Sequence, residues 1–251
     1  MPELSAQSIF SVFAETAARR GDHTAVIYLG SRFSYRRVKQ LADAFAAAMA
    51  GLGVKPGQKV MLYIPNSIQW VVAWLGLQRL GAVAVPITPI YTPHDIIYIA
   101  NDSGADTIVC ADTNFGYVSS ALPKTGLKRV VFSNMADLLP AWKRAFGYLF
   151  DVVPRGRTER SANAHAFHRL VAGSMGISPP DFGGRGGSDT AEILYTGGTT
   201  KFPKGVPISH AFFLVSADEQ IRISTPLVAP EENVVMGNAP LFHVLGQTCS
   251  L

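Results

Sequence analysis

The residues best suited to chemistry lie in one short segment, 195–206, which reads YTGGTTKFPKGV. It combines glycines, threonines and two lysines around a single proline. Glycines let backbone N–H groups come close to an anion, hydroxyl groups donate hydrogen bonds, and an ammonium group neutralises phosphate charge. This combination favours a polyphosphate ligand such as ATP or another nucleoside triphosphate.

Two common phosphate-binding motifs do not fit this chain. Lys204 is followed by glycine instead of serine or threonine, so the Walker A pattern fails. The dinucleotide fingerprint GxGxxG also fails, because Gly51, Gly53 and Gly57 are one residue out of register. On composition alone, a flexible connector with a surface lysine remains an open alternative.

Segment 195–206 closely resembles the phosphate-binding signature of the adenylate-forming (AMP-binding) superfamily, which includes acyl-CoA synthetases, luciferases and peptide-synthetase adenylation domains. Three further segments resemble the family in the same order: 33–67, 81–109 and 238–246, the last of which reads NAPLFHVLG. The chain is identified as similar to the N-terminal portion of a long-chain fatty acyl-CoA synthetase. The family's downstream motifs and its small C-terminal domain do not occur in this sequence.

The resemblance implies an ATP-dependent fatty acid–CoA ligase. Such an enzyme adenylates a carboxylic acid to acyl-AMP with release of pyrophosphate, and then forms a thioester with CoA. ATP, Mg²⁺ and CoA are therefore the expected cofactors and substrates beside the fatty acid, and the missing C-terminal portion of the chain is an expected partner. We expect the fragment alone to be inactive. An adenylate-forming enzyme for aryl or amino acids, or a non-catalytic remnant that binds nucleotide or membrane, stays open.

The same resemblance implies the residues of the nucleotide site. These match the family signature position by position: Thr196, Gly197, Gly198, Thr199, Thr200, Lys201, Lys204 and Gly205. Lys204 is the expected catalytic cation, with a solvated surface lysine as the alternative. Lys201 stands where the family usually has glycine, so the loop either follows another path with a second cation or binds nucleotide less tightly.

His243, within PLFHV, matches a family histidine between the acyl pocket and the nucleotide. The resemblance implies a catalytic residue that orients the carboxylate or gates the pocket. A general base is not required, because a fatty carboxylate is already ionised at neutral pH. A buried core histidine is the alternative. His165 and His168 are spaced like a weak metal pair without a third ligand, so no metal-binding residue is expected.

The charge of the chain is concentrated in one segment. Residues 141–170 contain six basic and two acidic residues, which accounts for the whole net charge of +4. An apolar stripe is predicted on a helix beside these charges, formed by Trp142, Phe146, Leu149, Phe150 and Val153. Basic amphipathic helices with aromatic residues are typical of membrane surfaces. Residues 142–160 therefore indicate either contact with an anionic membrane or a helix packed on its own domain, and no nucleic-acid partner is expected.

The pattern of apolar residues predicts an α/β fold of parallel-sheet layers with flanking helices, a partial N-terminal domain of the acyl-CoA synthetase/luciferase fold. Strands are predicted at 24–29, 59–64, 83–87, 107–111, 191–195 and 234–236. Helices are predicted near residue 10, after Ser34, at 68–80 and 93–102, and from Ser209 to about residue 223. Repeated strand–helix–strand units favour a parallel sheet, and 161–188 is interpreted as a weakly ordered linker.

The expected domains are a first α/β subdomain, 1–180, with the basic insertion at about 140–170, and the start of a second subdomain, 181–251. Only two cysteines occur, Cys110 and Cys249, in no disulfide or thiolate-metal pattern. We therefore expect a cytoplasmic protein, which could also associate peripherally with the inner face of the membrane.

Overall fold

The computed structural model describes residues 6–158, 163–181, 186–197, 202–225, 227–229 and 233–250. Within this part of the chain a seven-stranded sheet has the order β7-β6-β5-β3-β4-β8-β9. Its strands are β3 (Lys59–Tyr63), β4 (Val83–Pro86), β5 (Thr107–Ala111), β6 (Arg129–Ser133), β7 (Ala164–Ala166), β8 (Thr190–Tyr195) and β9 (Gly205–Ser209). All neighbours are parallel except β8 and β9. The predicted α/β class with a mainly parallel sheet is confirmed.

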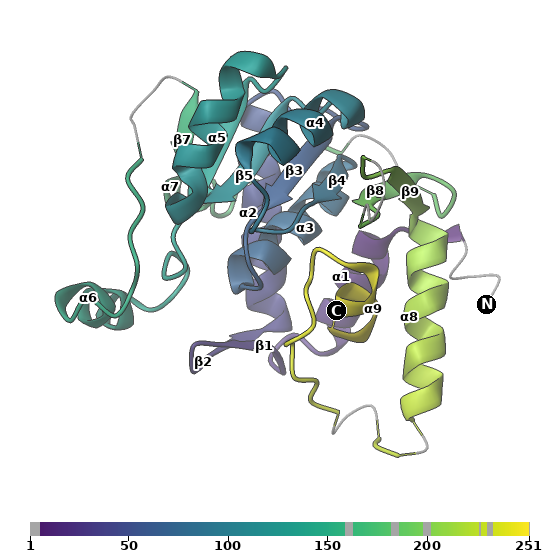
Figure 1. The fold of residues 1–251 in the computed structure, drawn as a ribbon. Coiled ribbons are helices and arrows are strands. Elements are labelled where there is room, and N and C mark those ends of the chain that lie inside the picture. Colours follow the sequence, from purple (N-terminus) through teal and green to yellow (C-terminus); the bar gives the residue numbers. More distant parts are fainter. Residues whose placement is uncertain are drawn as a thin grey trace.

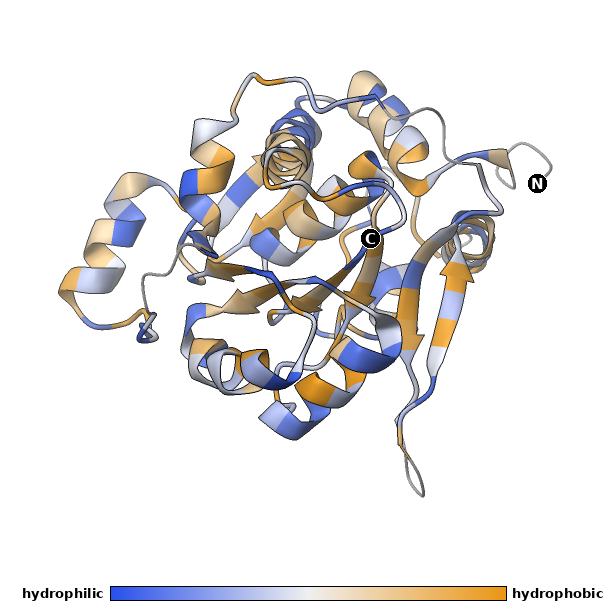
Figure 2. Cartoon of the chain, turned by 90° about the horizontal axis from the view of Figure 1, so that it is seen from above, coloured by the Kyte–Doolittle hydropathy of each residue, from blue (hydrophilic) through white to orange (hydrophobic). Residues whose placement is uncertain are grey.

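Two layers of helices cover the sheet (Figure 1). One layer contains α1 (Ile9–Arg19), α2 (Tyr35–Gly51), α3 (Ile68–Leu80), α7 (Phe167–Gly173) and α8 (His210–Ser224), and the other contains α4 (Pro93–Ser103) and α5 (Phe115–Ala121). Short 3₁₀ turns, η2 (Asp112–Asn114) and η3 (Leu122–Lys124), flank α5. The strands between the layers are largely hydrophobic (Figure 2), as expected for a parallel sheet buried on both faces.

Serine side chains begin several of these helices. The Oγ of Ser34 accepts a hydrogen bond from the backbone N–H of Arg37, and Ser209 Oγ accepts one from Phe212. Each bond satisfies a backbone donor that the first helical turn leaves free. Both predicted helix starts are thus confirmed, and α3 has the predicted bounds.

The first predicted strand does not join the parallel sheet. β1 (Thr24–Tyr28) pairs antiparallel with β2 (Ser31–Ser34) in a separate two-stranded sheet. The chain reverses at Leu29 and Gly30, whose φ angles of 46° and 67° form a tight turn. An apolar strand pattern is the same in a parallel and an antiparallel pair, so it did not reveal this hairpin.

Two other predictions were wrong. Val234–Met236 is irregular instead of a strand, and all three side chains are exposed. The supposed linker contains β7 and α7, which complete one edge of the sheet and bury Phe167 against Phe45 of α2. A three-residue strand and a seven-residue helix are too short to show a clear period.

Helix α6 (Ala141–Leu149) stands apart from both layers (Figure 1). The prediction that Val153 extends the apolar stripe of this helix was wrong, because the helix ends at Leu149. Asp151 has φ 52°, and the N–H groups of Val152 and Val153 both donate back to the Gly147 carbonyl. Val153 is therefore buried, whereas the helix itself contains no buried residue.

Strand β8 joins the sheet beside β4, with Ala84 opposite Glu192. Residues on both sides of the predicted boundary at 180 thus share one sheet, and the division into subdomains stays a prediction. Among the described residues, no helix is long and apolar enough to cross a membrane.

Candidate active site

The β8–β9 hairpin presents the predicted phosphate loop. Tyr195 pairs with Gly205 at the end of the two strands. One step further, the Thr196 N–H donates to the Lys204 carbonyl at 3.0 Å, and the Lys204 N–H donates to Thr196 Oγ1 at 3.2 Å. The hairpin is therefore closed up to these two residues. The predicted site residues Gly198, Thr199, Thr200 and Lys201 lie outside the described residues.

The described residues of the loop leave their polar groups accessible. Thr196, Gly197 and Lys204 are exposed, and no ion pair joins Lys204 to another described residue. The backbone approaches its neighbours closely at Gly205: a Cβ there would lie 3.0 Å from Ile193 Cγ2 and 3.1 Å from Tyr195 Cζ, so these side chains would have to move slightly. The hairpin thus packs closely around Gly205 and leaves the Lys204 side chain exposed at its open end.

Helix α4 anchors both ends of the loop. The Tyr195 hydroxyl donates to Asp102 Oδ2 at 2.6 Å, and the Tyr98 hydroxyl donates to the Pro203 carbonyl at 3.0 Å. The rings of Tyr98 and Phe202 stack with centroids 4.8 Å apart. Burial, followed by the hydrogen bond to Asp102 and its negative charge, raises the pKa of Tyr195, so this hydroxyl remains a donor at neutral pH.

His243 lies directly before α9 (Val244–Ser250). It is exposed, so the alternative of a buried core histidine does not hold, and its Nδ1 accepts the Leu245 N–H at 3.3 Å. The preceding segment is fixed by Asn66: the Leu241 N–H donates to Asn66 Oδ1 at 2.9 Å, and Asn66 Nδ2 donates to the Ala239 carbonyl at 2.7 Å.

Both segments lie at the same edge of the sheet. Asn66 follows the carboxyl end of β3, and the loop follows the carboxyl end of β8, with the parallel strand β4 between them. Ligands of open α/β sheets bind beyond the carboxyl ends of the strands. The described part of the loop and the His243 segment therefore both lie at the edge of the sheet where a ligand is expected.

The family model described as "AMP-binding enzyme" matches residues 13–251 of the chain. The chain belongs to the AMP-binding enzyme family.

Curated relatives of this AMP-binding chain are CoA ligases. A long-chain-fatty-acid–CoA ligase of Escherichia coli O157:H7 is 31% identical over 96% of this chain and 44% of its own length. The 4-coumarate–CoA ligase 5 of Oryza sativa subsp. japonica is 31% identical over 93% of this chain and 38% of its own length. The chain thus spans less than half of the relatives it matches, and they act on different acids.

Solved structures show the same fold. A long-chain-fatty-acid–CoA ligase of Archaeoglobus fulgidus gives a TM-score of 0.69 at 24% identity, covering 96% of this chain and 44% of its own. A benzoate CoA ligase of Burkholderia xenovorans LB400 gives a TM-score of 0.65 at 21% identity. The match covers 96% of this chain and 42% of the benzoate ligase chain. At these identities the likeness establishes the fold of the AMP-binding chain and leaves its acid substrate open.

The anchoring residues of the site were not found from sequence. Asn66, Tyr98 and Asp102 act through contacts to distant parts of the chain, and nothing in their local pattern marks them. Glu192 did carry a signal, because it is a charged residue within the otherwise apolar strand of segment 191–195. It is fully buried in β8.

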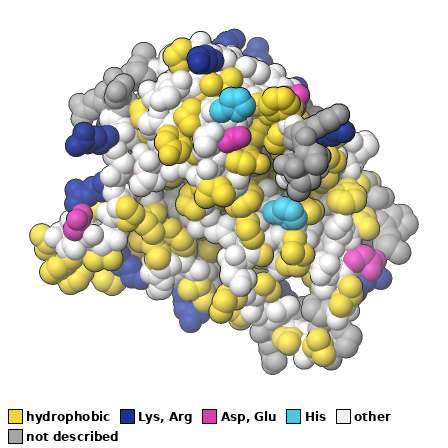
Figure 3. All heavy atoms as spheres, viewed as in Figure 1, with side chains coloured by type: hydrophobic (Ala, Val, Ile, Leu, Met, Phe, Trp, Pro, Cys, Tyr) yellow, Lys and Arg dark blue, Asp and Glu magenta, His cyan; other side chains and the backbone are white. Residues whose placement is uncertain are grey.

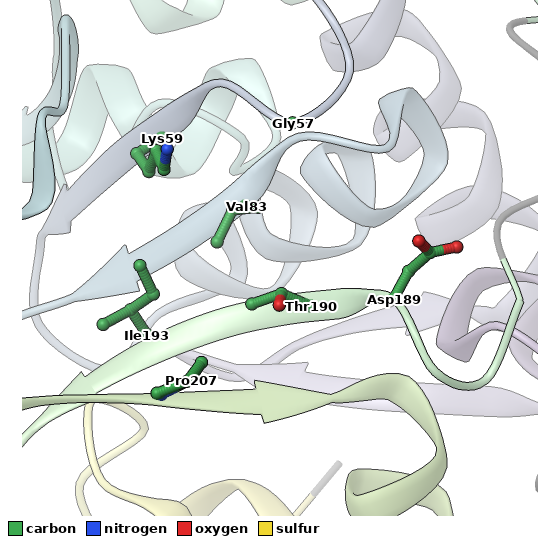
Figure 4. A pocket seen from close by; sticks show the side chains of 7 residues that line it. All are labelled: Gly57, Lys59, Val83, Asp189, Thr190, Ile193 and Pro207. Atoms are coloured by element: carbon green, nitrogen blue, oxygen red, sulfur yellow. The ribbon is translucent and has the colours of Figure 1, made fainter.

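Two other features lie outside this site. A recess of about 320 Å³ is lined by Gly57, Lys59, Val83, Asp189, Thr190, Ile193 and Pro207 (Figure 4). Several of these residues stand at the amino ends of strands, away from the ligand edge.

His168, one of the two histidines considered as a weak metal pair, lies near a carboxylate instead: its Nδ1 is 3.3 Å from Asp137 Oδ1. No group of three metal-binding side chains occurs among the described residues.

Proposed function

We propose that this protein is an ATP-dependent fatty acid–CoA ligase. The acid carboxylate attacks the α-phosphorus of ATP and displaces pyrophosphate, and the CoA thiol then displaces AMP from the acyl-adenylate. The observation that carries the proposal is the closed β8–β9 hairpin, which presents Thr196 and Lys204 at the carboxyl edge of the sheet, the same edge at which Asn66 holds the His243 segment.

Each residue is given a role by its position. Lys204 neutralises charge on the phosphate oxygens, while the Thr196 hydroxyl and the Gly197 N–H donate hydrogen bonds to them. His243 orients the attacking carboxylate. Mg²⁺ is expected to arrive with the triphosphate, since it binds largely through substrate phosphates and water, and it adds further neutralising charge.

The test is carboxylate-dependent exchange of pyrophosphate into ATP, measured on the full-length protein. Lys204→Ala is expected to lower the exchange rate at least tenfold, because a cation is removed from the developing charge. Lys55→Ala, which removes an exposed lysine elsewhere, is the matched control and should leave the rate unchanged. Equal rates for both variants would count against the role of Lys204.

The acid substrate is proposed from the fatty acyl ligases among the relatives, and the aryl ligases give the competing choice. A panel of palmitate, 4-coumarate and benzoate separates them. Exchange supported by palmitate at least tenfold better than by either aryl acid is the expected result. Preference for an aryl acid would move the protein to the alternative function.

A second role is favoured by the exposure of α6. Trp142, Phe146 and Leu149 are 67%, 60% and 78% exposed, and Phe150 and Val152 add further apolar surface. Figure 3 shows these hydrophobic side chains gathered over α6 with basic side chains at the border. We propose that α6 and the basic segment after it bind the surface of an anionic membrane, which would place a cytoplasmic protein at the inner leaflet.

Co-sedimentation with vesicles tests this role. The double variant Trp142→Ser/Phe146→Ser should reduce the fraction bound to vesicles containing 30% phosphatidylglycerol at least fivefold. Tyr117→Ser, at another exposed aromatic residue, serves as the control. Binding of all three proteins to the same extent would leave α6 as an ordinary surface helix.

We also propose that further chain of the same polypeptide covers α8 and α9. Large apolar side chains are exposed in this region: Phe212, Ile221, Ile223, Val234, Met236 and Leu245. Many exposed large apolar side chains in one region are typical of an interface, and the relatives continue well beyond the matched region.

A further inference from the structure

The turn that joins β1 to β2 contains a residue that is unusual at its position. Leu29 and Gly30 are its two central residues, and both have positive φ, 46° and 67°. In type I′ turns of this kind, asparagine or aspartate usually precedes the glycine, because these side chains tolerate the left-handed region. For leucine that conformation is strained. The Leu29 side chain is 48% exposed, so burial in the core does not offset the strain.

The β1–β2 hairpin has one packed face and one exposed face. Val26, Tyr28 and Phe33 pack against the hydrophobic core. Ile27 stands opposite Arg32, and both side chains are exposed, that of Ile27 by 53%. Successive residues of a strand point to opposite sides, so these two lie on the outer face. The hairpin therefore presents an aliphatic and a basic side chain to solvent close to the strained leucine.

A lysine of α6 contacts this turn. Lys143 Nζ donates to the Leu29 carbonyl at 3.0 Å, and the same atom lies 5.5 Å from the centroid of the Trp142 ring. Both elements lie toward the lower left of Figure 1. One ammonium group thus contacts both the tip of the hairpin and the exposed aromatic side chain of α6, although the two segments are 114 residues apart in the sequence.

We propose that the tip of the β1–β2 hairpin is a second membrane-binding element beside α6, with Leu29 and Ile27 entering the interface of an anionic bilayer. The inference rests on the proposed membrane role of α6. A residue held in a strained conformation at an exposed position points to a function. Entry into the boundary between headgroups and acyl chains would remove its apolar surface from water.

The charges of the two elements fit an anionic bilayer. Segments 27–32 and 141–157 contain five basic residues and one acidic residue: Arg32, Lys143, Arg144, Arg155 and Arg157, against Asp151. Basic residues near an anionic membrane each contribute favourably to binding. A projecting tip can enter a bilayer, which has no fixed shape, whereas a protein would have to provide a matching recess rich in carboxylates. Such a protein is the competing occupant.

Co-sedimentation of the full-length protein with vesicles containing 30% phosphatidylglycerol tests the tip. Leu29→Asn should lower the bound fraction at least twofold, while the unfolding temperature stays the same or rises, because asparagine suits the turn. Leu29→Met keeps an apolar side chain and should change binding less than twofold. Tyr117→Asn is the matched control, since Tyr117 is 51% exposed on α5 in the other helix layer. Ile27→Thr keeps a β-branched strand residue and should also lower binding at least twofold.

A fall of less than twofold in Leu29→Asn, or an equal fall in Leu29→Met or Tyr117→Asn, would overturn the inference. A lower unfolding temperature of Leu29→Asn would count against it, because a damaged turn would then explain the lost binding. Vesicles of phosphatidylcholine alone should bind at least fivefold less wild-type protein. Equal binding to both kinds of vesicle would contradict the choice of an anionic surface.

Hydrogen exchange with and without anionic vesicles separates this inference from the role of α6. Amides 29–31 and 141–149 should both exchange at least threefold more slowly on the vesicles. Protection of 141–149 alone would overturn the hairpin contact and leave the role of α6 standing. Protection of 29–31 alone would support the hairpin contact and overturn the role of α6. Protection of neither segment would overturn both and favour a protein partner, while pyrophosphate exchange still tests the ligase function independently.

Discussion

Single side chains decide the geometry at the mouth of the hairpin. Tyr195 ties the end of β8 to Asp102 of α4, and Tyr98 ties the returning chain to the same helix through Pro203. The side chain of Lys204 is left in solvent. An exposed ammonium group on a long side chain can reach the phosphate oxygens of a bound nucleotide, which suits the proposed transfer.

At this scale, Glu192→Gln is expected to change how stability depends on pH. The pKa of Glu192 rises from its ordinary value of 4.5 to about 7 in the folded protein, chiefly through burial. Below about pH 4.5 both folded and unfolded states are protonated, so the group has no effect. Between about pH 4.5 and 7 only the unfolded state ionises, and the wild type loses about 3 kcal/mol of unfolding free energy.

The glutamine variant does not titrate and escapes this loss. Its unfolding free energy relative to the wild type should therefore increase by about 3 kcal/mol between pH 4.5 and 8. Urea unfolding at both pH values measures the difference. A difference that is the same at both pH values would show that Glu192 is not buried in its neutral form.

At the scale of elements, the most extensive helix–helix contact among the described residues is between α2 and α3. A Cβ on Gly76 would lie 2.8 Å from Phe45 Cδ1 and 2.9 Å from the Ala42 carbonyl, so only glycine lets α3 pack this tightly on α2. Because α3 also carries Trp74, this packing helps to position the partner of Glu192.

Gly76→Ala should therefore destabilise the fold by about 2 kcal/mol, since overpacking a close contact forces the helices apart. Gly116→Ala in α5 meets nothing within 4 Å and is the control, with a stabilisation of up to about 1 kcal/mol from helix propensity. Thermal and urea unfolding give both values. A stabilised Gly76→Ala would contradict the tight α2–α3 contact.

Elements with a clear period and a capping residue could be predicted from the sequence, as α3 and the helix after Ser209 show. The pairing of strands could not be predicted. β1 carries the same apolar pattern in a hairpin as it would in a parallel sheet. β9 contains Pro207, which is unusual in a strand, and pairs with β8 across the loop. In the site, the motif predicted the loop. Asn66 and Asp102 could not be predicted, because the contacts that give them a role span 93 residues or more.

At the scale of the whole molecule, the parallel sheet gathers distant segments at one edge. Segments near residues 66, 98 and 102 hold the pieces that carry Lys204 and His243, although these lie far away in the sequence. Two helix layers cover the sheet, and α6 stands outside them with Trp142, Phe146 and Leu149 exposed (Figure 1). The fold therefore separates the edge that we propose binds ATP from the surface that we propose contacts a membrane.

The most direct test of the central claim is a crystal structure of the full-length protein with Mg²⁺ and a non-hydrolysable ATP analogue. The β- and γ-phosphates should lie within hydrogen-bond distance of Thr196 Oγ1 and Lys204 Nζ, with the α-phosphate toward His243. A triphosphate bound at another place, with the 195–205 hairpin unchanged and empty, would contradict the assignment of this loop as the nucleotide site.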